Sequence, residues 1–134
     1  MKIRYAALSD YEWLKARDRH VSDTLLSQKI SNQEIYVLEH QGEQAGWIRF
    51  GYFWDNTPFL NLLWLDEPYR GQGLGREAMY DWEQKMLIQG YDQVMTSTQA
   101  DEDAQHFYRK LGYKDAGCLV LDSQPLEIVM LKKL

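Results

Sequence analysis

The stretch Arg70-Gly71-Gln72-Gly73-Leu74-Gly75 decides how the rest of this sequence is interpreted. A largely apolar run, Phe59 to Leu65, precedes it, and a segment with helical spacing of apolar residues follows, from Leu74 to about Gln89. The first four N–H groups of a helix lack partners within the helix, and the helix dipole is positive at that end. A glycine-rich turn between a strand and a helix therefore predicts a binding site for a phosphate or pyrophosphate.

Two familiar phosphate-binding loops do not match this spacing. A P-loop requires a glycine, four residues and then Gly-Lys-Ser/Thr, but counting from Gly71 places Arg76 at the second glycine. A dinucleotide-binding loop requires glycines at the first, third and sixth positions, and Arg76 again occupies the sixth. The spacing thus disfavours an unrelated nucleotide-binding domain, a reading that binding of ATP or NAD would restore.

The spacing that does fit is Arg/Gln-x-x-Gly-x-Gly/Ala, formed by Arg70, Gly73 and Gly75. A second motif, DEDAQHFYRKLGY, spans residues 101–113. With these two motifs the sequence resembles the GNAT superfamily, the acyl-CoA-dependent N-acetyltransferases, over nearly the whole chain. The resemblance implies a single domain, residues 1–134, of the α/β (α+β) class. Its expected architecture is a mixed, mostly antiparallel twisted sheet of about seven strands with helices on both faces.

The periodicity of apolar residues predicts the same succession of elements independently. Ser22 is the expected N-cap of the second helix, and Phe59–Asp66 is expected inside the sheet because it is apolar on both faces. The expected strands are Lys2–Ala6, Ile35–Glu39, Ala45–Trp54, Phe59–Asp66, Asp92–Ser97, Tyr113–Asp122 and Leu126–Leu131. The expected helices are Asp10–His20, Ser22–Ile30, Leu74–Gln89 and one from about Asp101 to Leu111.

The resemblance also implies a cosubstrate, acetyl-CoA, and a set of site residues. Its pyrophosphate is expected on the loop Arg70, Gly71, Gln72, Gly73, Leu74 and Gly75, with Arg76 as a second source of charge. Its pantetheine arm is expected to pair with the backbone at Leu63, Trp64 and Leu65, where an amide near Leu65 faces the thioester oxygen. Tyr108 matches the family tyrosine that donates a proton to the departing thiolate, and a phenol suits that role because its pKa, about 10, is near that of a thiol.

The general base stays open at this point. Many small-molecule members of the family carry a carboxylate in the strand before the loop, but Asn61 and Leu62 stand there in this chain. The remaining candidates are Asp55, Asp66, Glu67, a water relay, or no dedicated base. Because no cysteine lies in the motif region, direct transfer of the acyl group is expected.

The acceptor is expected to be a primary amine on a small molecule, a peptide or a protein, and the acyl group is acetyl or longer. The expected acceptor groove is formed by the first two helices and the turn before Phe59, with Trp13, Arg17, Tyr52, Trp54 and Asp55. Aromatic walls suit an apolar or cationic ligand. The alternative is a non-catalytic module of the same fold that binds acyl-CoA as a sensor. Homodimers are common in the family, but no residue here indicates an interface.

Composition excludes several other classes. The net charge of −5 argues against a general nucleic-acid binder, and no apolar run is long enough to predict a membrane span. The histidines, His20, His40 and His106, lack metal-ligand spacing, so no metal site is expected. Cys118 is the only cysteine; we expect it to be buried in a strand and the protein to be cytoplasmic.

Overall fold

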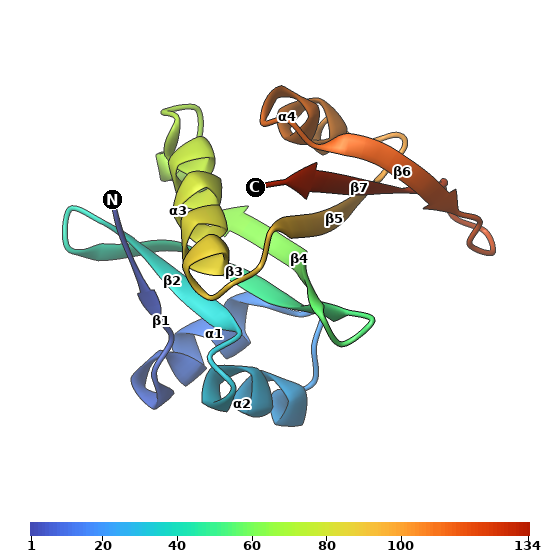
Figure 1. Cartoon of the computed structure of the whole chain (residues 1–134). Helices are drawn as coiled ribbons and strands as arrows, with labels where there is room; N and C mark the ends of the chain where they lie inside the picture. Colours follow the sequence, from blue (N-terminus) through green and yellow to red (C-terminus); the bar gives the residue numbers. More distant parts are fainter. The chain divides into compact units, whose positions relative to one another are not determined.

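The computed structural model describes all 134 residues (Figure 1). Seven strands form one sheet in the order β1-β2-β3-β4-β5-β7-β6. β4 and β5 pair in parallel, whereas β1 with β2, β2 with β3, β5 with β7 and β6 with β7 pair antiparallel. The predicted fold class, a mixed and mostly antiparallel sheet of about seven strands with α-helices, is therefore confirmed.

The elements follow the predicted order. The strands are β1 (Lys2–Tyr5), β2 (Ile35–His40), β3 (Glu43–Phe53), β4 (Thr57–Leu65), β5 (Gln93–Gln99), β6 (Lys114–Leu119) and β7 (Glu127–Lys133). The α-helices are α1 (Tyr11–Arg17), α2 (Asp23–Ser31), α3 (Leu74–Ile88) and α4 (Ala104–Lys110). Two 3-10 helices, η1 (Leu8–Asp10) and η2 (Glu67–Tyr69), precede α1 and the glycine loop.

By its internal contacts the chain forms two compact units. The first unit comprises Met1–Phe50 and Leu62–Ala78, and the second comprises Gly51–Asn61 and Met79–Leu134. β4 and α3 each contribute residues to both units. The glycine loop belongs to the first unit, and the second motif, with Tyr108, belongs to the second.

The core of the first unit lies between the helices α1 and α2 and the strands β2 and β3. Ser22 is the N-cap of α2 as predicted, because its side-chain oxygen accepts the Leu25 N–H at 3.2 Å. The buried side chains are Ala6, Leu14, Leu26, Ile30, Ile35, Val37 and Trp47. They come from five elements or their connections, so one apolar cluster joins the helices to the strands.

The second unit is organised by β5, β7 and β6 together with most of α3 and with α4. The register Phe59–Met95 and Leu60–Thr96 joins the first half of β4 to β5 in parallel. Along α3 the predicted apolar stripe is buried: Trp82 and Met86 have no exposed surface, and Met79 beside them has none either.

Some predicted bounds and one predicted burial differ from the structure. The first helix ends at Arg17 rather than His20, because Asp18 adopts an extended conformation and its carboxylate accepts hydrogen bonds from Trp47 and Arg49. The last helix begins at Ala104, three residues later than expected. Cys118 is exposed instead of buried, because β6 is the last strand of the sheet and all six of its residues are exposed.

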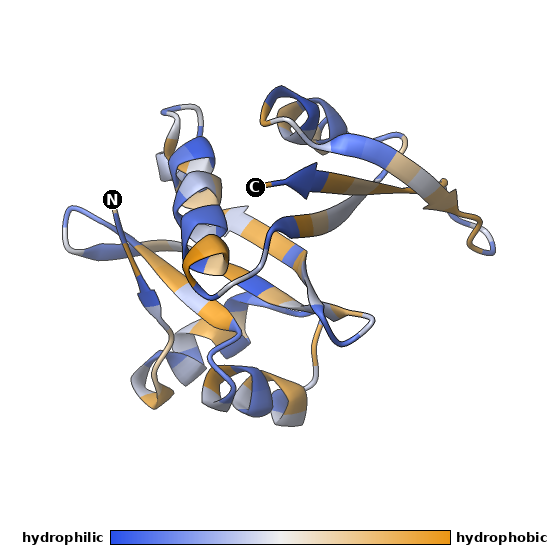
Figure 2. Ribbon diagram, in the orientation of Figure 1, coloured by the Kyte–Doolittle hydropathy of each residue, from blue (hydrophilic) through white to orange (hydrophobic).

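The edge strand β6 has two further features. Its pairing with β7 shifts register between Asp115 and Gly117, and Gly117 has a φ of +136°. Beyond the bulge, Leu119 is 52% exposed and Val120 is 83% exposed. Figure 2 shows the apolar colour at the end of β6 and in the connection to β7.

Candidate active site

The glycine loop, residues 70–75, runs from the end of η2 into the first turn of α3. Gly71 and Gly73 have φ values of +72° and +82°, which glycine alone adopts without strain. A Cβ atom added at either position meets no protein atom within 4 Å. The loop therefore requires glycine for its backbone conformation, and the space beside both residues is open.

The backbone N–H groups of residues 71–76 form a row that has no acceptor in the protein. The Arg70 N–H donates to the Glu67 carbonyl at 3.2 Å, and the Glu77 N–H donates to the Gly73 carbonyl at 3.1 Å, where α3 begins. None of the six N–H groups between these two donates to a protein oxygen. Free N–H groups at a helix N-terminus carry partial positive charge, so the loop fits a pyrophosphate group.

The long side chains of the loop are turned back onto the protein. The Arg70 Nε donates to the Leu65 carbonyl at 2.7 Å, and the guanidinium carbon lies 4.6 Å from the centroid of the Trp64 ring. The Gln72 Nε2 donates to the Pro68 carbonyl at 2.9 Å. Both side chains brace the loop, which leaves the amide row as its main anion-binding feature and the Arg70 Nη atoms as an added charge.

The end of β4 is fixed against β3 by a close approach of the two backbones. The Asp66 N–H donates to the Ala45 carbonyl at 2.8 Å, and the Trp64 carbonyl oxygen lies where a Cβ of Gly46 would be placed. Backbone groups alternate in direction along a strand. Those of Leu63 and Leu65 therefore point away from β3, the direction needed to pair with an extended ligand.

Three tryptophans form a row in the first unit. The Trp13 and Trp47 ring centroids are 5.7 Å apart, and those of Trp47 and Trp64 are 6.2 Å apart. The Arg17 guanidinium carbon lies 4.3 Å from the Trp13 centroid. The Asp66 carboxylate accepts from the Trp64 Nε1 at 3.2 Å and lies 3.6 Å from the Arg17 Nε. Trp64 is 43% exposed, so the row ends in an indole that a ligand can reach.

Tyr108 lies on α4 in the second unit and is 8% exposed. Burial raises the pKa of its phenol to about 12; the nearby Thr96 hydroxyl offsets part of this rise, and Glu102 adds to it. The phenol is therefore protonated at neutral pH. Its pKa is further from that of a thiol than the sequence suggested, so it suits a hydrogen-bond donor to a thiolate better than a complete proton donor.

The predicted site residues are divided between the two units. The first unit holds Trp13, Arg17, Leu63, Trp64, Leu65, Asp66, Glu67 and the glycine loop. The second unit holds Tyr52, Trp54, Asp55 and Tyr108. Among the candidate bases, Asp66 is engaged with Trp64 and Arg17, whereas Asp55 and Glu67 are exposed in a turn and in η2.

A protein-family model, that of the acetyltransferase (GNAT) family, matches residues 3–113. The chain belongs to this family. No curated protein sequence matches this GNAT protein closely enough to be counted as a relative. None of its helices is long and apolar enough to cross a membrane.

Solved structures share the fold of this GNAT protein across nearly its full length. Ard1 from Thermoplasma volcanium matches with a TM-score of 0.83 at 18% identity, covering 99% of this chain and 97% of that chain. The ribosomal-protein-S18-alanine N-acetyltransferase from Escherichia coli matches with 0.77 at 20% identity, covering 98% and 92%. A GNAT family acetyltransferase from Elizabethkingia anophelis, solved with acetyl-CoA bound, matches with 0.75 at 19% identity, covering 99% and 97%.

The sequence did not reveal a buried ionic cluster in the second unit of this GNAT protein. Glu83, on α3, is 4% exposed and accepts from the Tyr113 hydroxyl at 2.8 Å and from the Lys132 Nζ at 2.7 Å. Burial and the Glu83 carboxylate raise the pKa of Tyr113 above its usual range. Glu83 directly follows the buried Trp82, and an acid beside the apolar stripe of a helix was the one available signal.

Proposed function

We propose that this chain, acting as one domain over residues 1–134, is an N-acetyltransferase that moves an acetyl group from acetyl-CoA to a primary amine. The observation that carries the proposal is the row of six backbone N–H groups at residues 71–76 without acceptors in the protein. Membership of the GNAT family and the fold shared with a structure that contains acetyl-CoA support the same cosubstrate.

In this proposal the first unit anchors the cosubstrate. The amides of the glycine loop hold the pyrophosphate, and Arg70 adds positive charge beside it. The outward N–H groups of Leu63 and Leu65 and the Leu63 carbonyl pair with the pantetheine arm as an added strand would, while the Leu65 carbonyl accepts from Arg70. Acetyl-CoA supplies the activated acyl group as a thioester, and an amide near Leu65 donates a hydrogen bond toward its carbonyl oxygen.

In the second unit, Tyr108 is proposed to assist the leaving group. Its raised pKa keeps the hydroxyl protonated, so it donates a hydrogen bond to the sulfur on which negative charge develops. The chain's one cysteine, Cys118, lies on the edge strand β6 and outside both motifs. We therefore propose direct transfer to the amine without an acyl-enzyme.

The proposed acceptor is a primary amine on a small molecule or at a peptide or protein amine. The Escherichia coli protein of the same fold acts, by its name, on an alanine of a ribosomal protein, which supports including peptide N-termini among the acceptors to be screened. The pair Trp64 and Asp66, partly exposed beside the end of β4, is the proposed acceptor-side surface of the first unit.

The first test is a thermal-shift titration with acetyl-CoA, with ATP and NAD as controls. At 100 times Kd, a ligand that binds the folded state alone adds about 2.7 kcal/mol, which corresponds to roughly 10 °C in Tm for a domain of this size. A stabilisation by acetyl-CoA that ATP and NAD do not reproduce is expected. Absence of any shift with acetyl-CoA contradicts the proposal.

The second test measures turnover over a panel of small amines and peptides. Release of the CoA thiol is followed with a thiol reagent, in a Cys118→Ser variant, because the exposed native thiol would otherwise react with the reagent. Acetyl-CoA binding without turnover on any amine would favour the alternative, a non-catalytic acyl-CoA-binding module.

A further inference from the structure

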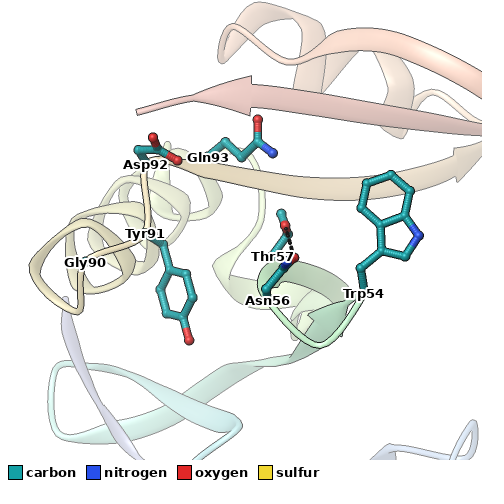
Figure 3. Close-up of a pocket in the computed structure, with 7 residues that line it drawn as sticks. All are labelled: Trp54, Asn56, Thr57, Gly90, Tyr91, Asp92 and Gln93. Carbon is teal, nitrogen blue, oxygen red and sulfur yellow. Dashed lines mark hydrogen bonds between the residues drawn. The ribbon is translucent and has the colours of Figure 1, made fainter.

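A pocket of about 440 Å³ lies in the second unit, between two chain segments. Trp54, Asn56 and Thr57 line it from the β3–β4 turn, and residues 90–93 line it from the connection between α3 and β5. Figure 3 shows the Trp54 and Tyr91 rings on opposite sides of Asn56 and Thr57, with Asp92 and Gln93 above them. The size is within the range of small-molecule sites.

The turn that presents Trp54 to the pocket is strained. Trp54 and Asp55 have φ values of +55° and +61°, and the Asn56 N–H donates to the Phe53 carbonyl at 3.2 Å, so they occupy the centre of a two-residue hairpin turn. Asn-Gly or Asp-Gly is usual at these positions, and each left-handed residue other than glycine costs on the order of 1–2 kcal/mol. Backbone strain of this kind is found mostly at functional sites, where it positions a side chain that takes part in the function.

The indole of Trp54 is 77% exposed, and its one ring contact is with Phe53, at a centroid distance of 4.6 Å. The second aromatic wall is Tyr91, whose ring contacts that of Tyr52 in a tilted arrangement, with the centroids 5.6 Å apart. Electron-rich ring faces attract cations, most strongly for tryptophan. Two such rings at one pocket predict a cationic ligand.

The charged and polar groups that line the pocket also favour a cationic ligand. Asp92 is exposed and its carboxylate makes no hydrogen bond or ion pair within the protein, while its backbone carbonyl is fixed by the Leu134 N–H at 2.8 Å. The Asn56 side-chain oxygen accepts from the Thr57 hydroxyl at 2.9 Å, which orients the amide beside it. Lys133, the register partner of Gln93 on β7, is exposed to solvent.

The pocket is separate from the residue proposed to act on the leaving group. Tyr108 interacts with Thr96, which lies three positions along β5 from Gln93, or about 10 Å at the rise of a strand. Side chains an odd number of residues apart point to opposite faces of the sheet. A ligand at Gln93 therefore does not compete with one at Tyr108.

We propose that this pocket is a binding site for an organic cation, a quaternary or protonated ammonium group held between Trp54 and Tyr91 and paired with Asp92. The inference stands on the second unit alone and does not depend on acetyl transfer. A quaternary ammonium probe keeps the two separate, because its nitrogen cannot be acetylated.

The test uses choline and its neutral carbon isostere, 3,3-dimethyl-1-butanol, titrated into the whole protein at constant ionic strength. Binding is followed by the NMR signal of the Trp54 indole N–H, assigned by its loss in a Trp54→Asn variant. We expect a saturable shift with choline at millimolar concentration, and affinity for the neutral isostere at least tenfold weaker. Equal affinity for the two compounds, or no saturable shift with choline, overturns the proposal.

Two variants locate the site. Asp92→Asn removes the carboxylate of an exposed residue and is expected to weaken choline binding by about tenfold, a typical value for the loss of a charge partner. The control is Asp101→Asn, an exposed acid outside the pocket, which is expected to bind choline as the native protein does. Trp54→Asn lacks the NMR probe, so its binding is followed by thermal shift: the variant relieves the turn strain and is expected to have a higher Tm, which choline is expected not to raise further. Undiminished binding by Asp92→Asn or Trp54→Asn contradicts the assignment.

Discussion

Replacing Gly73 by alanine separates what the glycine loop does for folding from what it does for a ligand. The added methyl group meets no protein atom within 4 Å, so the fold is disturbed through the backbone alone, at a φ of +82°. A left-handed alanine costs about 1–2 kcal/mol, and the smaller entropy of the unfolded alanine chain offsets about 0.4–1 kcal/mol. The expected net loss of about 1 kcal/mol lowers Tm by roughly 3–5 °C.

The matched control is Gly42→Ala, in the turn between β2 and β3. Gly42 has the same φ of +82° and the same open surroundings, so the two variants carry the same backbone cost. Gly73, however, belongs to the amide row, so we expect its added methyl group to crowd a pyrophosphate bound there. Loss of one hydrogen bond to a charged group costs about 1.5–3 kcal/mol, which weakens acetyl-CoA binding by roughly 10- to 100-fold.

Isothermal titration of both variants with acetyl-CoA measures this difference directly. Gly42→Ala is expected to bind as the native protein does, and Gly73→Ala to bind at least tenfold more weakly although its Tm matches that of the control. Equal dissociation constants for the two variants would refute the reasoning, because the amide row would then have no part in binding.

Three further predictions concern the two units. Tyr108→Phe is expected to lower kcat roughly 100-fold at saturating substrates. The pKa of Tyr108 is about 12 in the folded protein and about 10 in the unfolded chain, so the native protein is expected to lose up to ~1.4 kcal/mol of stability per pH unit between pH 10 and 12, a loss that the variant lacks. Denaturant titrations of both proteins at these pH values measure the difference. Asp18→Ala leaves a buried arginine without its partner and is expected to cost about 3–5 kcal/mol by urea denaturation, much more than Asp115→Ala, which breaks an exposed pair. Gly46→Ala places a methyl group on a β4 carbonyl oxygen, so it is expected to lose more stability than Asp115→Ala. A smaller loss than that of Asp115→Ala would show that the strands separate easily at this point.

Features with a local period were predictable from the sequence. The α3 stripe repeats every three to four residues, so its burial followed from spacing alone. β4 is apolar on both faces, which placed it inside the sheet, where it is the fourth of seven strands. The glycine turn before α3 was predictable because its conformation depends on consecutive residues rather than on distant side chains.

Features that depend on distant partners were not predictable in the same way. Asp18 and Arg49 are 31 residues apart in the sequence, and Lys132 and Glu83 are 49 residues apart. No local sequence pattern indicates which acidic and basic side chains form these ion pairs. The hairpin turn was expected at residues 55–58, where Asp, Asn, Thr and Pro cluster, but its two central residues are Trp54 and Asp55. Turn propensity favours Asn and Gly there, whereas the structure has Trp54 and Asp55 in the two left-handed positions.

At the outer edge of the sheet, β6 offers unpaired backbone groups to which a strand of another molecule can add. At the start of this edge, pairing with another strand is disfavoured by the charges of Lys114 and Asp115 and by the bulge that follows them, because a twisted, charged strand pairs poorly. The end of β6 and the two residues that follow it, Cys118 to Leu121, are exposed and apolar and carry no charge. We therefore expect self-association in concentrated solution to begin there, and we expect a single charge, Val120→Lys, to raise the solubility of the protein.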